Sequence, residues 1–221
     1  GVVSFYIKSR DVTNFKELQN ALVTATAEAT KNVPLRPNAV HPITRKNSGN
    51  NVGEHIPNIQ WVYGDVDYFE LTAFVKGGGS ENMSTLAMLT PDVGVKGIKK
   101  FVVESVVKAG GKPCPPIILG IGIGGTVDLT YKLAKLALLR PIGSRHTDGS
   151  IAKLETELLE LVNKTGIGPM GLGGEVTALD VKAEYAHCHT TSLPVGVNMQ
   201  CWADRKASAR IHPDNRVEYL T

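Results

Sequence analysis

A short run of apolar and glycine residues limits the folds open to this chain more than any other feature. It reads Ile-Ile-Leu-Gly-Ile-Gly-Ile from Ile117 to Ile123, and a continuous run of this kind is typical of a strand that is buried on both faces. The segment from Thr126 to Leu139 follows with the spacing of an amphipathic helix. The two segments predict a strand, turn and helix, and we expect a mixed α/β chain of two α/β subdomains.

The other patterns predict further helices and strands. Apolar residues at helical spacing after Asp11 or Thr13 predict a helix that Pro34 ends, and the polar stretch from Asn38 to Pro57 predicts a long surface loop. Alternation in residues 59–63 and 69–75 predicts two antiparallel strands. The remaining expected helices cover residues 81–89, 95–108 and 151–163, and the remaining strands cover residues 176–185, 195–202 and two runs about residue 214.

Composition narrows the class of protein. The chain has 221 residues, 42% of them hydrophobic and 20% charged, as expected of a soluble globular protein. Its apolar runs are far shorter than the roughly 20 residues that cross a bilayer. The net charge of +3 comes from scattered Lys and Arg residues, so nucleic-acid binding has little electrostatic support and a small dicarboxylate suits the chain better.

The cysteines and the first residues bear on the compartment. Cys114, Cys188 and Cys201 are too few for a disulfide framework, which favours a reducing cytoplasm. The opening from Gly1 to Phe5 lacks the basic and apolar regions of a signal peptide. It also lacks an initiator Met, so we expect the native protein to contain a segment upstream of Gly1.

Two glycine-rich motifs could bind an anion. The run Gly77-Gly78-Gly79 follows Lys76 and precedes an expected helix, so its backbone N–H groups could approach a carboxylate or phosphate closely; a flexible turn is the alternative. Residues 120–125 match G-x-G-x-x-G between a strand and a helix, the dinucleotide fingerprint. No second strand with an acidic residue follows at the required distance, which favours a tight turn over dinucleotide binding.

Two metal sites can be considered from the cysteines and histidines. His187 and His189 could bind zinc together with Cys201, although the pattern alone favours satisfied polar residues. Cys114 lies in the rigid sequence Pro-Cys-Pro-Pro, which holds its thiol in a fixed direction, as iron–sulfur ligation requires.

Six blocks in the same order make the chain similar to a known family. They are Leu35-Arg36, Lys76 to Asn82, Cys114-Pro115-Pro116, Gly124-Gly125-Thr126, Gly168 to Gly174, and Pro194-Val195-Gly196 leading to Cys201-Trp202-Ala203-Asp204-Arg205. They resemble the alpha subunit, or N-terminal region, of the class I iron–sulfur hydro-lyases, which include class I fumarate hydratase and L-tartrate dehydratase. The resemblance covers almost the whole chain and implies one alpha-type domain over residues 1–221.

The resemblance also implies a site. In that family a 4Fe-4S cluster is held by three cysteines, two of which match Cys114 and Cys201 here. The third belongs to a Cys-Gln-Asp-Thr-Gly motif whose last residue matches Gly1, so it is expected upstream of this chain, and Cys188 is not at a ligand position. We expect the cluster to lie between the two subdomains. Arg36 and Gly78 match substrate-binding positions, and His189 matches an active-site histidine expected to act as the polar or acid–base residue.

The activity and partners follow from the same resemblance. The open iron of the cluster acts as a Lewis acid in the reversible hydration of fumarate to malate, a step of the tricarboxylic acid cycle. Other substrate-binding residues belong to a beta subunit, so we expect a hetero-oligomer that is active only with that partner. Dehydration of L-tartrate to oxaloacetate is the close alternative, and an NAD-dependent oxidoreductase or a zinc-binding module is a distant one.

Overall fold

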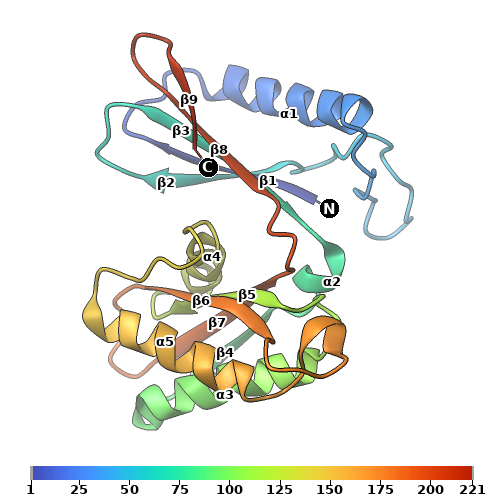
Figure 1. The fold of residues 1–221 in the computed structure, drawn as a ribbon. Coiled ribbons are helices and arrows are strands. Elements are labelled where there is room, and N and C mark those ends of the chain that lie inside the picture. Colours follow the sequence, from blue (N-terminus) through green and yellow to red (C-terminus); the bar gives the residue numbers. More distant parts are fainter. Residues whose placement is uncertain (1, 221) are drawn as a thin grey trace. The chain divides into compact units, whose positions relative to one another are not determined.

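The computed structural model describes residues 2–220 and divides into two compact units (Figure 1). The first unit contains the chain up to Gly78 and again from Arg205 onward, and the second unit is Gly79–Asp204. Each unit has helices packed on its own sheet, which confirms the mixed α/β class. Gly1, which matches the end of the expected upstream cysteine motif, lies outside the described residues.

The first unit is a five-stranded sheet with one long helix on it (Figure 1). Its strand order is β2-β1-β3-β8-β9, and Leu22 of the helix packs with Val3, Phe5 and Ile7 of β1. The helix begins after Asn14, whose side chain accepts a hydrogen bond from Glu17 N at 3.1 Å, so the cap lies one residue beyond Thr13. The elements are β1 (Val2–Ser9), α1 (Phe15–Asn32), β2 (Asn58–Tyr63), β3 (Phe69–Lys76), β8 (Lys206–Ile211) and β9 (Val217–Leu220).

The expected antiparallel strands of residues 59–75 form but do not pair with each other. β1 lies between them, parallel to β2 and antiparallel to β3. The loop before them matches the expectation, because residues 33–57 contain only two isolated bridges.

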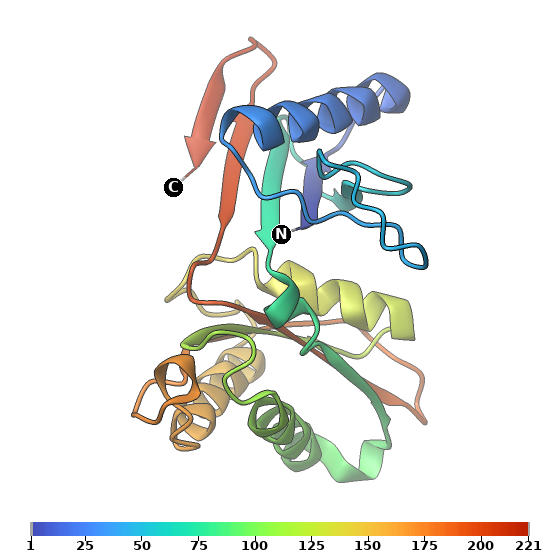
Figure 2. The same cartoon turned by 90° about the vertical axis from the view of Figure 1, so that its right-hand side faces the viewer.

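The second unit is a four-stranded sheet in the order β4-β7-β5-β6, covered by helices on both faces. Figure 2 shows α4 on one face and α3 and α5 on the other. Its elements are α2 (Gly78–Glu81), which straddles the unit boundary, then β4 (Thr85–Leu89), α3 (Gly94–Ala109), β5 (Ile117–Ile123), α4 (Val127–Ala137), α5 (Gly149–Asn163), β6 (Ala178–Tyr185) and β7 (Leu193–Gln200). The buried strand β5 and the helices α3, α4 and α5 occur where the sequence predicts them.

The expected helix over residues 81–89 is wrong. Residues 85–89 form the edge strand β4, antiparallel to β7, with Ala87 opposite Val195. Leu, Ala and Met favour helices, but pairing with a strand more than 100 residues later outweighs that weak local preference.

The two faces of the four-stranded sheet differ in chemistry. The face under α3 and α5 is apolar and includes Leu119, Ile121, Val197 and Met199. The face under α4 carries Gly120, whose missing side chain lets the helix backbone approach.

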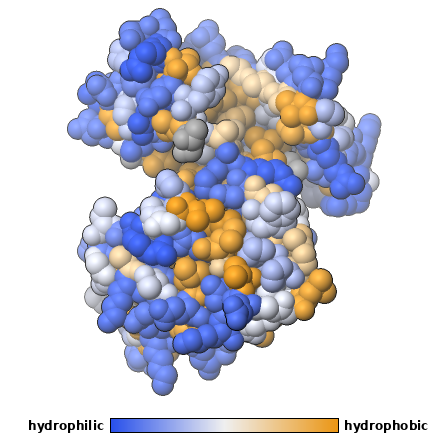
Figure 3. Space-filling model, viewed as in Figure 1, coloured by the Kyte–Doolittle hydropathy of each residue, from blue (hydrophilic) through white to orange (hydrophobic). Residues whose placement is uncertain are grey.

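On the surface, the visible face of each unit shows hydrophilic residues around smaller hydrophobic groups (Figure 3). Among residues 2–220, no helix combines the length and apolar character needed to cross a bilayer.

Candidate functional site

Strand directions gather several segments at one end of the four-stranded sheet. β7 is antiparallel to both β4 and β5, and β6 is parallel to β5. The starts of β4, β5 and β6 therefore lie at the end where β7 finishes. Cys114 precedes β5 and Cys201 follows β7, so we call this the cysteine end of the sheet.

The backbone joins the two cysteine loops directly. Trp202 N donates to Cys114 O at 3.4 Å, and Cys114 N donates to Gly111 O at 3.1 Å. Cys114 is exposed and has a φ of 59°, whereas Cys201 is only 9% exposed. A non-glycine residue in the left-handed region costs on the order of 1 kcal/mol or more, and such residues concentrate at functional sites.

Two glycine-rich segments lie beside Cys114. Met170 N donates to Pro115 O at 2.8 Å, which attaches the 166–174 loop to the cysteine loop. A Cβ at Gly111 would lie 2.6 Å from Met170 O, so glycine is required for this approach. Similarly, a Cβ at Gly79 would lie 2.8 Å from Lys112 O. The cysteine end is therefore lined by closely packed backbone that only glycine permits at these two positions.

His189 lies at the other end of this sheet. It belongs to the loop between β6 and β7, beside the turn at Gly124, whose N–H donates to Pro194 O at 2.9 Å. The eight residues of β7 separate this loop from Cys201, a span of roughly 25 Å at about 3.3 Å per residue. The structure thus brings Cys114 and Cys201 together but does not bring His189 to them within one chain.

The proposed zinc ligands are separated in the same way, because His187 and His189 share the far loop and Cys201 does not. In residues 2–220, no three His, Cys, Asp or Glu side chains form a group able to hold a metal ion. Cys188 is exposed, and its thiol donates to Ser192 O at 3.1 Å.

The matched substrate positions belong to the first unit. Arg36 is exposed, and its carbonyl accepts bonds from Asn38 Nδ2 at 3.0 Å and Asn51 Nδ2 at 3.1 Å. Asn51 is buried, so the backbone that carries Arg36 is fixed while its guanidinium faces solvent. Gly78 begins α2, and a Cβ there would meet no atom within 4 Å.

The G-x-G-x-x-G motif has a packing role here. Side chains at Gly120 and Gly122 would overlap the carbonyl oxygens of Ala134 and Thr130 on α4. Gly124 and Gly125 have φ values of 79° and 77° and make the turn into α4. Close helix packing and a tight turn therefore explain these four glycines.

The face under α4 carries buried polar residues that the sequence analysis did not single out. Asn198 Nδ2 donates to Ser84 Oγ at 2.8 Å, and Tyr131 interacts with both residues. Burial raises the pKa of Tyr131, so its phenol keeps the proton. Gln200 is also fully buried, and neither atom of its amide has a hydrogen-bond partner among the described residues.

An ionic cluster lies on β6 at this face. Lys182 Nζ lies 2.7 Å from Asp180 Oδ2, and both side chains are at most 1% exposed. Arg145 Nη1 donates to Asp180 Oδ1 at 2.7 Å, and Gly143 N donates to Oδ2 at 2.7 Å. Burial acts to raise the pKa of Asp180, but these bonds outweigh it and hold that pKa below its usual value. Burial lowers the pKa of Lys182.

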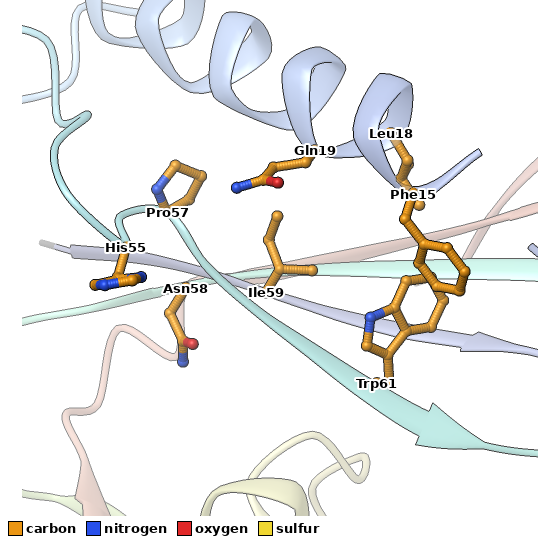
Figure 4. A pocket seen from close by; sticks show the side chains of 8 residues that line it. All are labelled: Phe15, Leu18, Gln19, His55, Pro57, Asn58, Ile59 and Trp61. Carbon is orange, nitrogen blue, oxygen red and sulfur yellow. The ribbon is translucent and has the colours of Figure 1, made fainter.

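A separate pocket of about 280 Å³ opens on the first unit between α1 and β2. Phe15 and Trp61 pack edge to face at its rim, with ring centroids 5.0 Å apart, and His55 and Asn58 lie at its other end (Figure 4). Gln19 and His55 are exposed, and Asn58 is half-buried with its Oδ1 accepting a bond from Gln60 Nε2 at 2.9 Å. The pocket is far less constrained than the cysteine end.

The cysteine end fits an iron–sulfur cluster in its donor chemistry. It offers two cysteine thiols, neither of them in a disulfide, from loops joined by a backbone hydrogen bond. Two thiols alone do not complete a cluster of this kind, so a third ligand has to come from outside the described residues. The fold and site thus define a mixed α/β protein in which two cysteine loops meet at one end of a four-stranded sheet.

Comparison with known proteins agrees with this class. Residues 1–210 match the family model described as fumarate hydratase (fumerase). A protein named "Putative L(+)-tartrate dehydratase subunit alpha" from Methanocaldococcus jannaschii is 59% identical over 192 residues, which is 86% of this chain and 67% of that protein. L(+)-tartrate dehydratase subunit alpha of Escherichia coli K12 is 38% identical over 206 residues, 93% of this chain and 68% of that protein.

The chain therefore belongs to the fumarate hydratase (fumerase) family, whose members are hydro-lyases. The family is iron–sulfur dependent in general, and its relatives named here are alpha subunits.

Proposed function

We propose that this chain is the alpha subunit of an iron–sulfur hydro-lyase that adds water to, or removes it from, a four-carbon dicarboxylate. The observation that carries the proposal is the pairing of the Cys114 and Cys201 loops through the Trp202 N to Cys114 O bond. These two cysteines would hold a 4Fe-4S cluster, with the third thiolate coming from the motif whose last residue matches Gly1. When bound, the cluster supplies a Lewis acid for the hydroxyl group that is exchanged.

The chain's own residues would bind and orient the substrate. The Arg36 guanidinium is exposed on a fixed backbone and suits a bidentate bond to a carboxylate. The uncrowded backbone at Gly78 suits a direct contact with the second carboxylate. Both assignments follow the family resemblance. They predict that Arg36→Lys raises KM, because a lysine cannot reproduce the planar two-point contact.

His189 is proposed as the acid–base residue, and its distance from Cys201 limits how it could reach the site. Thr191 N donates to His189 Nδ1 at 3.2 Å, so the proton of the neutral ring lies on Nε2. Because β7 separates His189 from Cys201 in one chain, the histidine would have to come from a second copy of the chain. Mixing His189→Ala with Cys114→Ser protein tests this: activity recovered from two inactive variants supports the shared site, and no recovery contradicts it.

Fumarate and L-tartrate are both candidate substrates. The family model is described by fumarate hydratase, whereas the curated relatives named above are L(+)-tartrate dehydratase subunits. The proposed partner is the beta subunit implied by those names, and the proposed compartment is the cytoplasm.

The test is anaerobic reconstitution of the natural full-length chain with iron and sulfide, with and without its beta subunit. Fumarate hydration is measured as the loss of fumarate absorbance, and tartrate dehydration is measured as the formation of oxaloacetate. Cluster absorbance and turnover that both disappear in Cys114→Ser and Cys201→Ser would support the proposal. A wild-type protein that takes up no cluster would contradict it, and the ratio of the two activities assigns the substrate.

A further inference from the structure

The two edges of the four-stranded sheet differ in how their backbone is protected. At the β6 edge, the N–H of Ala183 donates to Glu155 Oε1 at 2.8 Å, and its carbonyl accepts a bond from Arg140 Nη1 at 3.2 Å. The N–H of Val181 on the same strand donates to Asp180 Oδ1 at 2.8 Å. Charged side chains of this kind prevent a strand edge from pairing with another chain. The β6 edge is therefore closed.

The β4 edge has no such protection. Thr85–Leu89 pairs with β7 on one side, and among residues 2–220 no strand pairs with its other side. The strand contains neither a charged residue nor a proline, which are the usual devices against edge pairing. All five of its residues are at least partly exposed, and Met88 is 56% exposed. An open, uncharged edge can accept one more strand through backbone hydrogen bonds.

A second copy of the same strand fits this edge. Two identical strands that pair antiparallel about a two-fold axis are self-complementary. The register that uses all five residues places Ala87 opposite itself and Leu86 of each copy opposite Met88 of the other. These two side chains are two residues apart and so lie on one face of the sheet. The pairing therefore joins apolar side chains and brings no like charges together.

The same pairing would remove the separation of His189 from Cys201. Thr85 starts β4 near the cysteine end, and Leu89 lies opposite Leu193 at the other end of the sheet. An antiparallel second β4 reverses these ends, so the His189 loop of one copy comes to the cysteine end of the other. Three strand spacings, about 14 Å, then separate β7 of one copy from β7 of the other, against roughly 25 Å along β7 within one chain.

We infer that β4 is an interface between two copies of this chain, which pair edge to edge so that each supplies His189 to the cysteine end of the other. The inference rests on the proposed function, because it takes His189 as the acid–base residue of a cluster site that contains Cys114 and Cys201. The proposed cysteine ligands all belong to one chain. Loss of the interface should therefore stop turnover and leave cluster binding intact.

The experiment compares two double variants in the natural full-length chain assembled with its beta subunit. In the like-charge variant, Leu86→Glu and Met88→Glu place carboxylates opposite each other across the interface. In the opposite-charge variant, Leu86→Glu and Met88→Lys give each carboxylate an ammonium partner on the other copy. Both edges carry two charged side chains, so the variants differ mainly in whether the copies repel or attract each other.

Sedimentation equilibrium should find two copies of the chain in the wild-type assembly. The like-charge variant should have a dissociation constant about tenfold above that of the opposite-charge variant, because like charges directly opposite each other destabilise strand pairing. When diluted below its dissociation constant, it should lose turnover in proportion to the single copies formed. Its cluster absorbance per chain should equal that of the wild type.

Three results would overturn the inference. One is a fully active wild-type assembly with a single copy of the chain, and another is equal dissociation of the two double variants. If neither variant folds, hydrogen exchange is measured on the wild type. The amides of residues 85–89 should exchange more slowly as the concentration rises through the dimerisation range, and unchanged rates are the third contrary result. A wild-type protein that takes up no cluster refutes the proposed function instead, so the two failures are distinguishable.

Discussion

On the face of the four-stranded sheet under α3 and α5, β7 presents Val195, Val197 and Met199; under α4 the same strand presents Gly196, Asn198 and Gln200. Burial is nearly complete on both faces, so they differ in chemistry and not in access to water. An apolar side chain is stabilised by burial alone. Each polar group under α4 instead needs a specific partner. The comparison teaches that the apolar face supplies stability and the polar face restricts which arrangement is stable.

The largest expected effect comes from breaking a buried ion pair on the polar face. Lys182→Met leaves Asp180 buried with Arg145 as its remaining cation and should cost about 3 kcal/mol of unfolding free energy. Chemical denaturation of the cluster-free chain measures it. Lys153→Met is the control, because the exposed pair of Lys153 with Glu157 spans 4.0 Å and should contribute less than about 0.5 kcal/mol. Equal losses in the two variants would show that the α4 face tolerates an incomplete network.

A somewhat smaller effect should follow from adding one methyl group between the sheet and α4. Gly122→Ala would overlap Thr130 O, so the helix has to move and stability should fall by about 2–3 kcal/mol. Gly149→Ala, at the start of α5, meets no atom within 4 Å and should be stabilising by about 0.5 kcal/mol. Thermal unfolding of both variants decides the matter. A harmless Gly122→Ala would mean that close approach of α4 does not depend on these glycines.

Placing a polar side chain on the apolar face should lower the free energy of unfolding by about 2 kcal/mol. Met199→Gln places an amide among apolar side chains with no partner, which carries the penalty of an unsatisfied buried group. Met199→Leu keeps the apolar character and should cost less than about 1.5 kcal/mol. Denaturant midpoints of these variants test the distinction between the faces, and a Met199→Gln chain as stable as Met199→Leu would remove it.

The smallest effect is the pH dependence that Asp180 contributes. Its folded pKa lies below the unfolded value, so ionised Asp180 stabilises the fold above the unfolded pKa of about 3.9. This contribution is lost as the pH falls through the folded pKa. The stability difference between wild type and Asp180→Asn should therefore be constant near neutral pH and shrink on acidification below about pH 4. A difference that persists at lower pH would show that Asp180 acts without its charge.

Local elements could largely be predicted from the sequence, and long-range pairing could not. β5, α3, α4 and α5 carry patterns complete within each segment, so periodicity finds them. The insertion of β1 between β2 and β3 depends on residues more than 50 positions apart, and no local pattern records it. β4 was mistaken for a helix for the same reason.

The candidate site shows the same division. The resemblance to the family singled out Cys114 and Cys201. The hydrogen bond from Trp202 N to Cys114 O brings their two loops together. It did not indicate that β7 separates His189 from them. The burial of Asn198 and Gln200 was missed because alternation in a strand normally indicates a solvent-facing side. Here α4 covers that side of the strand. Whether a polar face of a strand contacts water or a helix depends on tertiary packing, which the local sequence does not record.

The strand order of the second unit also has a consequence for biosynthesis. β7 is the last of its four strands to leave the ribosome, yet it lies between β4 and β5, which are made much earlier. Until residue 200 has been synthesised, β4 and β5 have no common neighbour and Cys114 has no second cysteine beside it. If the two thiols hold a cluster as proposed, it can be completed there only after translation has passed Cys201.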